Sequence, residues 1–129
     1  MSEHVLDQID VLTDESPARH LAGFSAEADR SDGTQVFRLR GELDMATAPR
    51  LARALSTALD AGPTRLAIDL RDLTFIDSAG VRVVLAAGRR ARDAGAPLVL
   101  RSPCRSVRKV LRLTGADRML VIELGAATD

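Results

Sequence analysis

Apolar residues recur along this chain at two spacings, one typical of amphipathic helices and one typical of strands. Repeats every three or four positions predict helices over residues 47–61, 78–94 and 104–114. Short apolar or alternating runs predict strands over residues 20–27, 35–41, 66–70, 98–100 and 119–122. The run at 66–70 has no alternation, so we expect that strand to be covered on both faces or to lie inside a parallel sheet.

Turn signals arrange these elements into a fold. Asp32-Gly33, between the first two strands, is a strong tight-turn signal and predicts an N-terminal β-hairpin. From residue 47 onward helices and strands alternate with short links, which favours right-handed crossovers and parallel strand pairing. The sequence therefore predicts an α/β fold with an open mixed β-sheet, in which the hairpin is followed by βα repeats.

We expect a single domain over residues 20–124, between an N-terminal tail at 1–19 and a C-terminal tail at 125–129. The first tail is acidic, and its weak helical spacing is compatible with a short helix. Because the chain has three Phe and neither Trp nor Tyr among 129 residues, its one core is expected to be aliphatic.

Acidic and basic side chains balance overall, at 18 each, but they are distributed unevenly. Residues 1–63 hold eleven acidic and six basic side chains, a net charge of −5, and residues 64–129 hold seven acidic and twelve basic, a net charge of +5. A neutral chain with so few aromatic residues lacks the excess positive charge and the stacking platforms of a nucleic-acid binder. We therefore expect no nucleic-acid partner.

A single cysteine, Cys104, excludes an internal disulfide framework. The chain shows neither a signal-peptide pattern nor an apolar run of about 20 residues, so we expect a cytoplasmic protein with no membrane partner. Two His and one Cys without metal-ligand spacing predict no metal site, and no motif indicates another cofactor. Cys104 lies at the start of a predicted helix, where a redox-sensing thiol and an inert thiol are both open.

Functional crevices of open α/β sheets lie beyond the carboxyl ends of the strands, and two loops there are unusual, at 41–44 and 72–80. We expect Ser78 at the N-cap of the helix over 78–94, followed by the small residues Ala79 and Gly80. Two roles are open for this serine. It can cap the helix with its hydroxyl, or it can carry a phosphate that the helix dipole and unpaired N–H groups hold in place.

Four segments of the chain together resemble the STAS domain of bacterial anti-sigma factor antagonists, over residues 21–123. They are Gly41-Glu42-Leu43-Asp44, Leu66-Ala67-Ile68-Asp69-Leu70, Leu73-Thr74-Phe75-Ile76-Asp77-Ser78-Ala79-Gly80 and Leu111-Arg112-Leu113-Thr114-Gly115. The Phe-Ile-Asp-Ser-x-Gly element is the most specific of them. The resemblance implies a non-enzymatic protein whose unphosphorylated form binds an anti-sigma factor serine/threonine kinase and releases a sigma factor.

The resemblance also assigns roles to individual residues. It places the phosphorylation that switches binding off on Ser78, implies a serine phosphatase as a further partner, and matches Asp44 and Asp77 to acidic residues beside the site. The ordinary alternatives are that Asp44 satisfies loop N–H groups and that Asp77 faces the helix dipole. The expected partner-binding residues are Asp44, Asp77, Ser78, Ala79, Gly80, Arg82, Val83, Ala86 and Arg90.

The last four of these residues come from a helical wheel. Arg82, Val83, Ala86 and Arg90 lie opposite the predicted core face of Val81, Val84, Leu85, Gly88 and Ala91, so we expect them to form an exposed strip beside the serine. Two departures from the family pattern lie in the same region. Ala79 stands where many members have a second Ser or Thr, and Val81-Arg82 stands where many have Leu-Gly.

The sequence lacks residues that several enzymatic and phosphate-binding functions require. A nucleophile elbow needs glycine where this chain has Ile76, and a phospho-receiver needs a lysine after a late strand, whereas the only Lys, Lys109, lies in a predicted helix. A phosphate-binding Gly-x-x-x-x-Gly-Lys loop is absent. We therefore expect no enzyme. A STAS adaptor subunit of a transport or stressosome-like assembly, with a silent serine, stays open as an alternative.

The predicted helix over 104–114 has one strongly basic side. Val107, Val110, Leu111 and Thr114 are expected to face inward, and the basic side consists of Arg105, Arg108, Lys109 and Arg112. A solvated helix face and a contact with acidic lipid or a partner are both open for this side.

Overall fold

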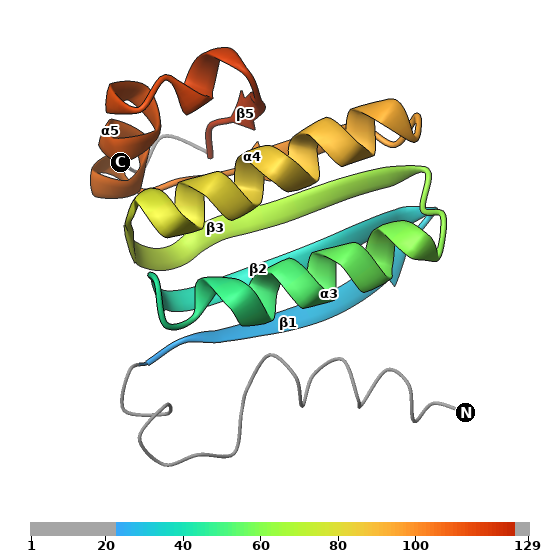
Figure 1. Cartoon of the computed structure of the whole chain (residues 1–129), viewed down its shortest axis with the longest axis horizontal. Coiled ribbons are helices and arrows are strands. Elements are labelled where there is room, and N and C mark those ends of the chain that lie inside the picture. Colours follow the sequence, from blue (N-terminus) through green and yellow to red (C-terminus); the bar gives the residue numbers. More distant parts are fainter. Residues whose placement is uncertain (1–22, 126–129) are drawn as a thin grey trace.

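Five strands form one sheet whose spatial order follows the chain, β1-β2-β3-β4-β5 (Figure 1). This computed structural model describes residues 23–125, so the tail predicted at 1–19 and residues 126–129 lie outside the described residues. The strands are β1 (Ser25–Ser31), β2 (Thr34–Leu43), β3 (Arg65–Ile76), β4 (Leu98–Arg101) and β5 (Val121–Glu123). The helices are α3 (Ala48–Asp60), α4 (Ser78–Asp93) and α5 (Arg105–Leu113), with a 3₁₀ turn η1 (Ala116–Arg118).

The strand directions confirm the predicted α/β class. β1 pairs with β2 antiparallel, and every later pair is parallel. A sheet in sequential order with right-handed crossovers collects its connecting helices on one face, and α3 and α4 lie side by side there (Figure 1). The core between sheet and helices is largely aliphatic, as expected, with Leu51, Ile68 and Leu100 fully buried around Phe37.

The N-terminal hairpin is confirmed with shifted bounds. Its turn is the two residues Asp32 and Gly33, both with positive φ (52° and 79°), the backbone that matches the twist of a two-residue hairpin. β1 runs from Ser25 to Ser31, whereas the prediction ended at residue 27, before the charged residues Asp29 and Arg30. An edge strand tolerates those charges, since one of its sides faces solvent.

The loop predicted at 72–80 is wrong, because β3 continues to Ile76 and α4 begins at Ser78. The extension pairs in parallel with β2, with Leu73 beside Gly41 and Ile76 beside Leu43, across two irregularities in register. Leu73 and Ile76 are buried, while Thr74 and the apolar Phe75 between them are exposed. A long central strand therefore carries the chain directly into α4.

The C-terminal part differs most from the prediction. α5 ends at Leu113. The left-handed Gly115 then begins the 3₁₀ turn η1, which the sequence pattern did not predict and which buries Ala116. The last strand, predicted at 119–122, is Val121–Glu123. Thr114, predicted to face inward, is exposed at the C-cap of α5, where its hydroxyl donates to the Val110 carbonyl at 2.8 Å.

The face of the sheet turned away from α3 and α4 carries a row of charges of alternating sign. The strand registers place Glu27 beside Arg38, Arg38 beside Asp69, Asp69 beside Arg101 and Arg101 beside Glu123, with one residue from each strand. The Arg101 and Glu123 side chains approach to 3.6 Å. Opposite charges on neighbouring strands stabilise their pairing, and a one-residue slip would turn this row toward the core.

Gly41 lets the start of β1 approach the end of β2. Its φ is +96°, and a Cβ at this position would overlap the Gly23 carbonyl oxygen. Gly62, just after α3, has a φ of +72°, but a Cβ at that position would meet nothing within 4 Å. The two glycines thus share the positive φ and differ in the steric constraint.

Gly41→Ala should therefore destabilise the protein more than Gly62→Ala. Both substitutions place a side chain in the left-handed region, at a cost of about 1–2 kcal/mol. Gly41→Ala should lower the free energy of unfolding by about 1–3 kcal/mol more, because it also forces backbone apart. Urea unfolding of the two variants measures the difference. Equal losses would show that the segment at Gly23 moves aside without cost.

Candidate functional site

The carboxyl ends of β2 and β3 meet at one edge of the sheet, and the chain leaves both there for a helix. The Asp77 N–H donates to the Leu43 carbonyl at 3.1 Å, which continues the pairing of the two strands to their last residues. Residues 44–47 then lead to α3, and Asp77 alone separates β3 from α4. This is the edge where open α/β sheets place their functional crevices.

Asp77 is the N-cap of α4. Its Oδ1 accepts a hydrogen bond from the Gly80 N–H at 3.0 Å, and its backbone is extended, at φ −110° and ψ −174°. Its Oδ2 accepts from the Met45 N–H, across 32 positions of sequence, at 3.1 Å. The prediction of Ser78 at the N-cap is therefore wrong, because the preceding aspartate reaches the same N–H group and is also a preferred capping residue.

Ser78 is the first helical residue, and it is exposed. Its hydroxyl makes no hydrogen bond to any residue between 23 and 125. It lies at the positive end of the α4 dipole, where the first-turn N–H groups have no helical partner. The hydroxyl is thus available for modification without loss of a contact inside this part of the chain.

The two small residues after Ser78 differ in accessibility. Ala79 is half-buried, whereas Gly80 is buried. A Cβ on Gly80 would press on Ile76 and Leu43 side-chain carbons at 2.9 Å. Gly80 was predicted to contact a partner, but its position assigns it to the packing of α4 on the strand ends.

Asp44 organises the loop before α3. Its Oδ1 accepts from the N–H groups of Ala46 at 2.9 Å and Thr47 at 3.1 Å, and its own N–H donates to the buried Thr47 hydroxyl at 2.9 Å. This is the loop-satisfying role that the sequence left open. Met45, the next residue of this loop, is 76% exposed. The sequence analysis did not identify it as a site residue.

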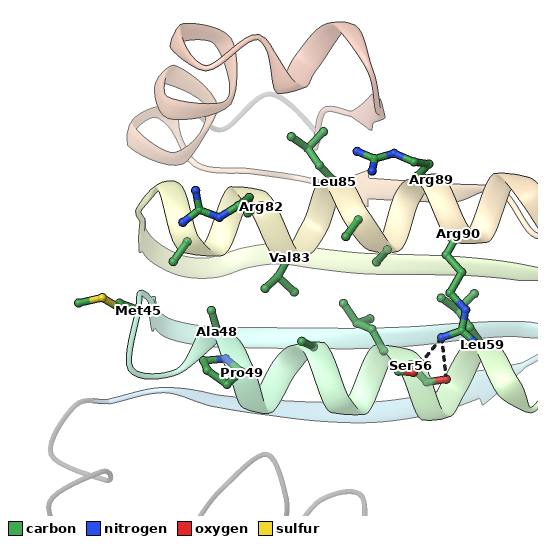
Figure 2. A pocket seen from close by; sticks show the side chains of 15 residues that line it. Met45, Ala48, Pro49, Ser56, Leu59, Arg82, Val83, Leu85, Arg89 and Arg90 are labelled. Carbon is green, nitrogen blue, oxygen red and sulfur yellow. Dashed lines mark hydrogen bonds between the residues drawn. The ribbon is translucent and has the colours of Figure 1, made fainter.

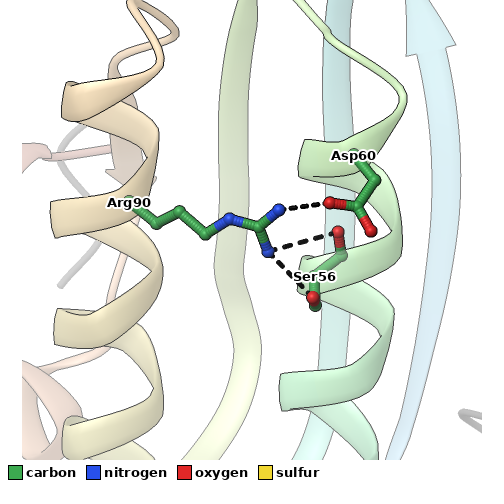
Figure 3. A network of polar contacts seen from close by, with 3 residues as sticks. All are labelled: Ser56, Asp60 and Arg90. Atoms are coloured by element: carbon green, nitrogen blue, oxygen red, sulfur yellow. Dashed lines mark hydrogen bonds and ion pairs between the residues drawn. The ribbon is translucent and has the colours of Figure 1, made fainter.

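The strip predicted on α4 is only partly exposed. Arg82 and Ala86 are exposed as expected, but Val83 is half-buried and packs against the core. Arg90 crosses to α3, where it donates to the Ser56 hydroxyl at 2.8 Å and forms an ion pair with Asp60 (Figure 3). A wheel of one helix could not predict this, because the neighbouring helix decides which side is covered. For the same reason Leu85 and Gly88, predicted inward, are partly exposed, and Ala87 is buried.

A groove of about 800 Å³ runs between α3 and α4 beside Ser78 (Figure 2). It is lined from α4 by Ala79, Arg82, Val83 and Ala86, all expected from the sequence, and from α3 by residues that the sequence analysis did not identify. The main ones on α3 are Ala48, Pro49, Ala52, Leu55, Ser56 and Leu59. Ala48, Leu55 and Leu59 belong to the buried face of α3, and Ala52 lies at its half-buried border, so the groove continues the edge of the core stripe.

The remaining features considered as sites are a thiol, possible metal ligands and the basic side of α5. The Cys104 thiol is partly buried at the start of α5 and donates to the Leu73 carbonyl at 3.3 Å. No cluster of three potential metal ligands occurs within residues 23–125, and no helix in that range is long and apolar enough to cross a membrane. On the basic side of α5, Arg105, Lys109 and Arg112 are exposed and Arg108 is half-buried.

Comparisons with known proteins agree with one another. Residues 26–123 match the family described as Mlab, STAS domain. BtrV of Bordetella bronchiseptica, assigned as an anti-sigma factor antagonist, is 36% identical over 87 residues, which cover 67% of this chain and 75% of BtrV. A solved anti-sigma factor antagonist from Mycobacterium paratuberculosis has a TM-score of 0.72 and 26% identity, over 78% of this chain and 85% of that one.

The anti-sigma factor antagonist SpoIIAA of Bacillus is similar in both of its solved forms. The unphosphorylated form has a TM-score of 0.67 and 29% identity, over 76% of this chain and 87% of SpoIIAA. The phosphorylated form has a TM-score of 0.60 and 30% identity, over 77% and 89%. The shared architecture is the five-stranded mixed sheet with its N-terminal hairpin and βα units.

The two hydrogen bonds of Asp77 should be separable by substitution. Asp77→Asn keeps an oxygen for the Gly80 N–H, but its amide nitrogen cannot accept from Met45. Asp77→Ala loses both bonds, and loss of the cap alone costs about 0.5–2 kcal/mol. We expect Asp77→Ala to lower the free energy of unfolding more than Asp77→Asn does, and both variants to shift the Met45 amide resonance in NMR spectra. An unshifted Met45 resonance in Asp77→Asn would contradict the link between the loop and the helix.

Proposed function

Because this chain belongs to the STAS-domain family of anti-sigma factor antagonists, we propose that it binds an anti-sigma factor serine/threonine kinase while Ser78 is unphosphorylated. Phosphorylation of Ser78 by that kinase ends the binding, and a serine phosphatase restores it. Bound antagonist removes the anti-sigma factor from its sigma factor. Antagonists of this family are non-enzymatic regulators, so the chain acts through binding alone.

One observation carries this proposal: the Ser78 hydroxyl has no structural task within the described residues. The capping role that competed with modification belongs to Asp77. An exposed serine at the first position of a helix presents its oxygen to a kinase without any unfolding. SpoIIAA has been solved with and without phosphate, which supports the view that this fold accepts the modification.

The charge around Ser78 explains how a phosphate would act on binding rather than on folding. A phosphate adds about −1.5 to −2 charges at neutral pH. Asp77 lies next to it in sequence and Asp44 organises the adjacent loop, so a partner would face a concentrated negative site. Like charges forced together at an interface cost several kcal/mol, and about 5.5 kcal/mol reverses a 99:1 equilibrium. Within the domain, the positive end of the α4 dipole offsets the added charge.

The surface that surrounds Ser78 supplies the rest of the proposed contact. Met45 and Arg82 line the mouth of the groove (Figure 2), and Ala79 and Ala86 also line it from α4. Val83 contributes its half-buried side chain to the groove wall. Arg90 contributes by holding α4 against α3, because its guanidinium is already engaged by Ser56 and Asp60.

Ser78 variants test the switch directly. Ser78→Ala should bind the anti-sigma factor persistently, and the phosphorylated protein should bind at least about 100-fold more weakly, which corresponds to ~2.8 kcal/mol. Ser78→Asp should lie between them, because aspartate carries less charge and fewer acceptor oxygens than phosphate. Titration calorimetry with the cognate anti-sigma factor measures the affinities, and thermal unfolding should give nearly the same Tm for all forms.

Ser31→Asp is the matched control, since Ser31 is exposed at the opposite end of the sheet. Its affinity should equal that of the unmodified protein. If phosphorylated Ser78 or Ser78→Asp bound the kinase as tightly as Ser78→Ala does, the switch would be wrong. The chain would then act as a STAS adaptor with a silent serine.

A further inference from the structure

The groove between α3 and α4 is closed at one end and open at the other. At the far end Arg90 spans the two helices through Ser56 and Asp60 (Figure 3). At the Ser78 end the exposed Met45 side chain projects at its mouth (Figure 2). An occupant therefore extends from Ser78 toward the Arg90 contact, along the length of α3, whose 13 residues span about 20 Å.

The floor of the groove suits an α-helix. Alanines line it from both sides, at Ala48 and Ala52 on α3 and at Ala79 and Ala86 on α4, so a third backbone can approach closely. Two neighbouring helices leave a channel that accepts an apolar stripe with i, i+3, i+4 and i+7 spacing. An added β-strand would need unpaired backbone groups, and the interior N–H and C=O groups of helices are already bonded along their own axes.

Two arginines on the edge of the groove indicate that the occupant carries negative charge. Arg82 and Arg89 both line the groove and are exposed. Within residues 23–125 neither has a carboxylate within 4 Å, whereas Arg90 is paired with Asp60. Arginine binds carboxylates through two parallel hydrogen bonds, so these side chains favour glutamate or aspartate beside an apolar stripe.

From this geometry we infer that the groove binds an acidic amphipathic helix of the anti-sigma factor, with its apolar stripe on the alanine floor and its carboxylates on Arg82 and Arg89. The inference rests on the proposed function and specifies the chemistry of its partner. It also explains the direction of the switch. Ala79 lines the groove next to Ser78, so a phosphate there adds negative charge where one end of an acidic helix would lie.

A synthetic peptide probe tests the groove itself. The probe has about 14 residues, with leucines at i, i+3, i+4 and i+7 and glutamates flanking them, and its counterpart has lysines in place of the glutamates. NMR titration of the full chain should shift the amides of α3 and α4 with the acidic peptide and not with the basic one. Equal binding of both peptides, or shifts confined to other elements, would overturn the inference.

Variants of the full chain connect the groove to the anti-sigma factor. Ala52→Leu fills the floor, and the pair Arg82→Glu and Arg89→Glu reverses the edge charge. Each should weaken binding of the anti-sigma factor to Ser78→Ala protein by about tenfold or more. Ala94→Leu and Arg53→Glu are the matched controls, because both residues are exposed and neither lines the groove. The control variants should keep their affinity.

The outcomes separate this inference from the proposed function. If the anti-sigma factor binds in a phosphate-dependent way but the groove variants do not weaken it, the inference fails and the switch stands. If no variant binds the anti-sigma factor and the acidic peptide still binds the groove, the proposed function fails. The anti-sigma factor is then excluded as the source of the helix, whereas the preference of the groove for an acidic amphipathic helix stands.

Two other occupants can be recognised and would also overturn the inference. A small amphiphilic acid would show itself if oleate bound the groove while the acidic peptide did not. A second copy of the chain would show itself in sedimentation velocity, as a dimer that Ala52→Leu dissociates.

Discussion

The carboxylate of Asp77 holds the functional end of the sheet in place because each of its oxygens accepts a hydrogen bond from a different segment. One bond lies inside the first turn of α4, and the other reaches the Met45 N–H in the loop before α3. The strands that deliver these segments are already paired up to Leu43 and Ile76, so this one side chain is enough to join loop and helix. Its second effect is chemical, since the Ser78 hydroxyl is released from the capping role.

The groove beside Ser78 is a product of two helices rather than of one. α4 alone would present a mixed strip of arginine, valine and alanine, but beside α3 it becomes one wall of a groove. The engagement of Arg90 with Ser56 and Asp60 shows how the pairing works, because a cation that faces solvent on a wheel is an interhelical contact in the fold. Exposed ion pairs contribute little stability by themselves, so this contact matters mainly for holding the spacing of the helices.

The sequence predicted well those features that depend on local chemistry. The Asp32-Gly33 turn, the helix that follows Thr47 and the parallel order of the later strands were all expected from residues within a few positions of one another. The N-cap was missed because Asp77 and Ser78 are both good capping residues, and only the distant Met45 N–H gives the aspartate a second bond. The length of β3 was missed for a related reason, since its pairing with β2 lies more than 30 positions away.

Predicting the groove also requires knowledge of how the helices pack, although the residues that form its α3 wall are regularly spaced in the sequence. A pattern of apolar residues shows which face of a helix is apolar, but it does not show where the neighbouring helix leaves the edge of that face uncovered. The family resemblance pointed to Ser78, and the structure shows why its hydroxyl is available: Asp77 caps the helix in its place.

The alternating charge row on the opposite face of the sheet ends in glutamate on both outer strands, Glu27 on β1 and Glu123 on β5. If two copies of the domain tried to extend their sheets edge to edge, the row would continue with like charges in contact, whichever edges met. Exposed strand edges are templates for aggregation, and the glutamates on both outer strands oppose such edge-to-edge pairing by charge repulsion. The face of the sheet that lies away from the groove therefore opposes edge-to-edge polymerisation of the domain.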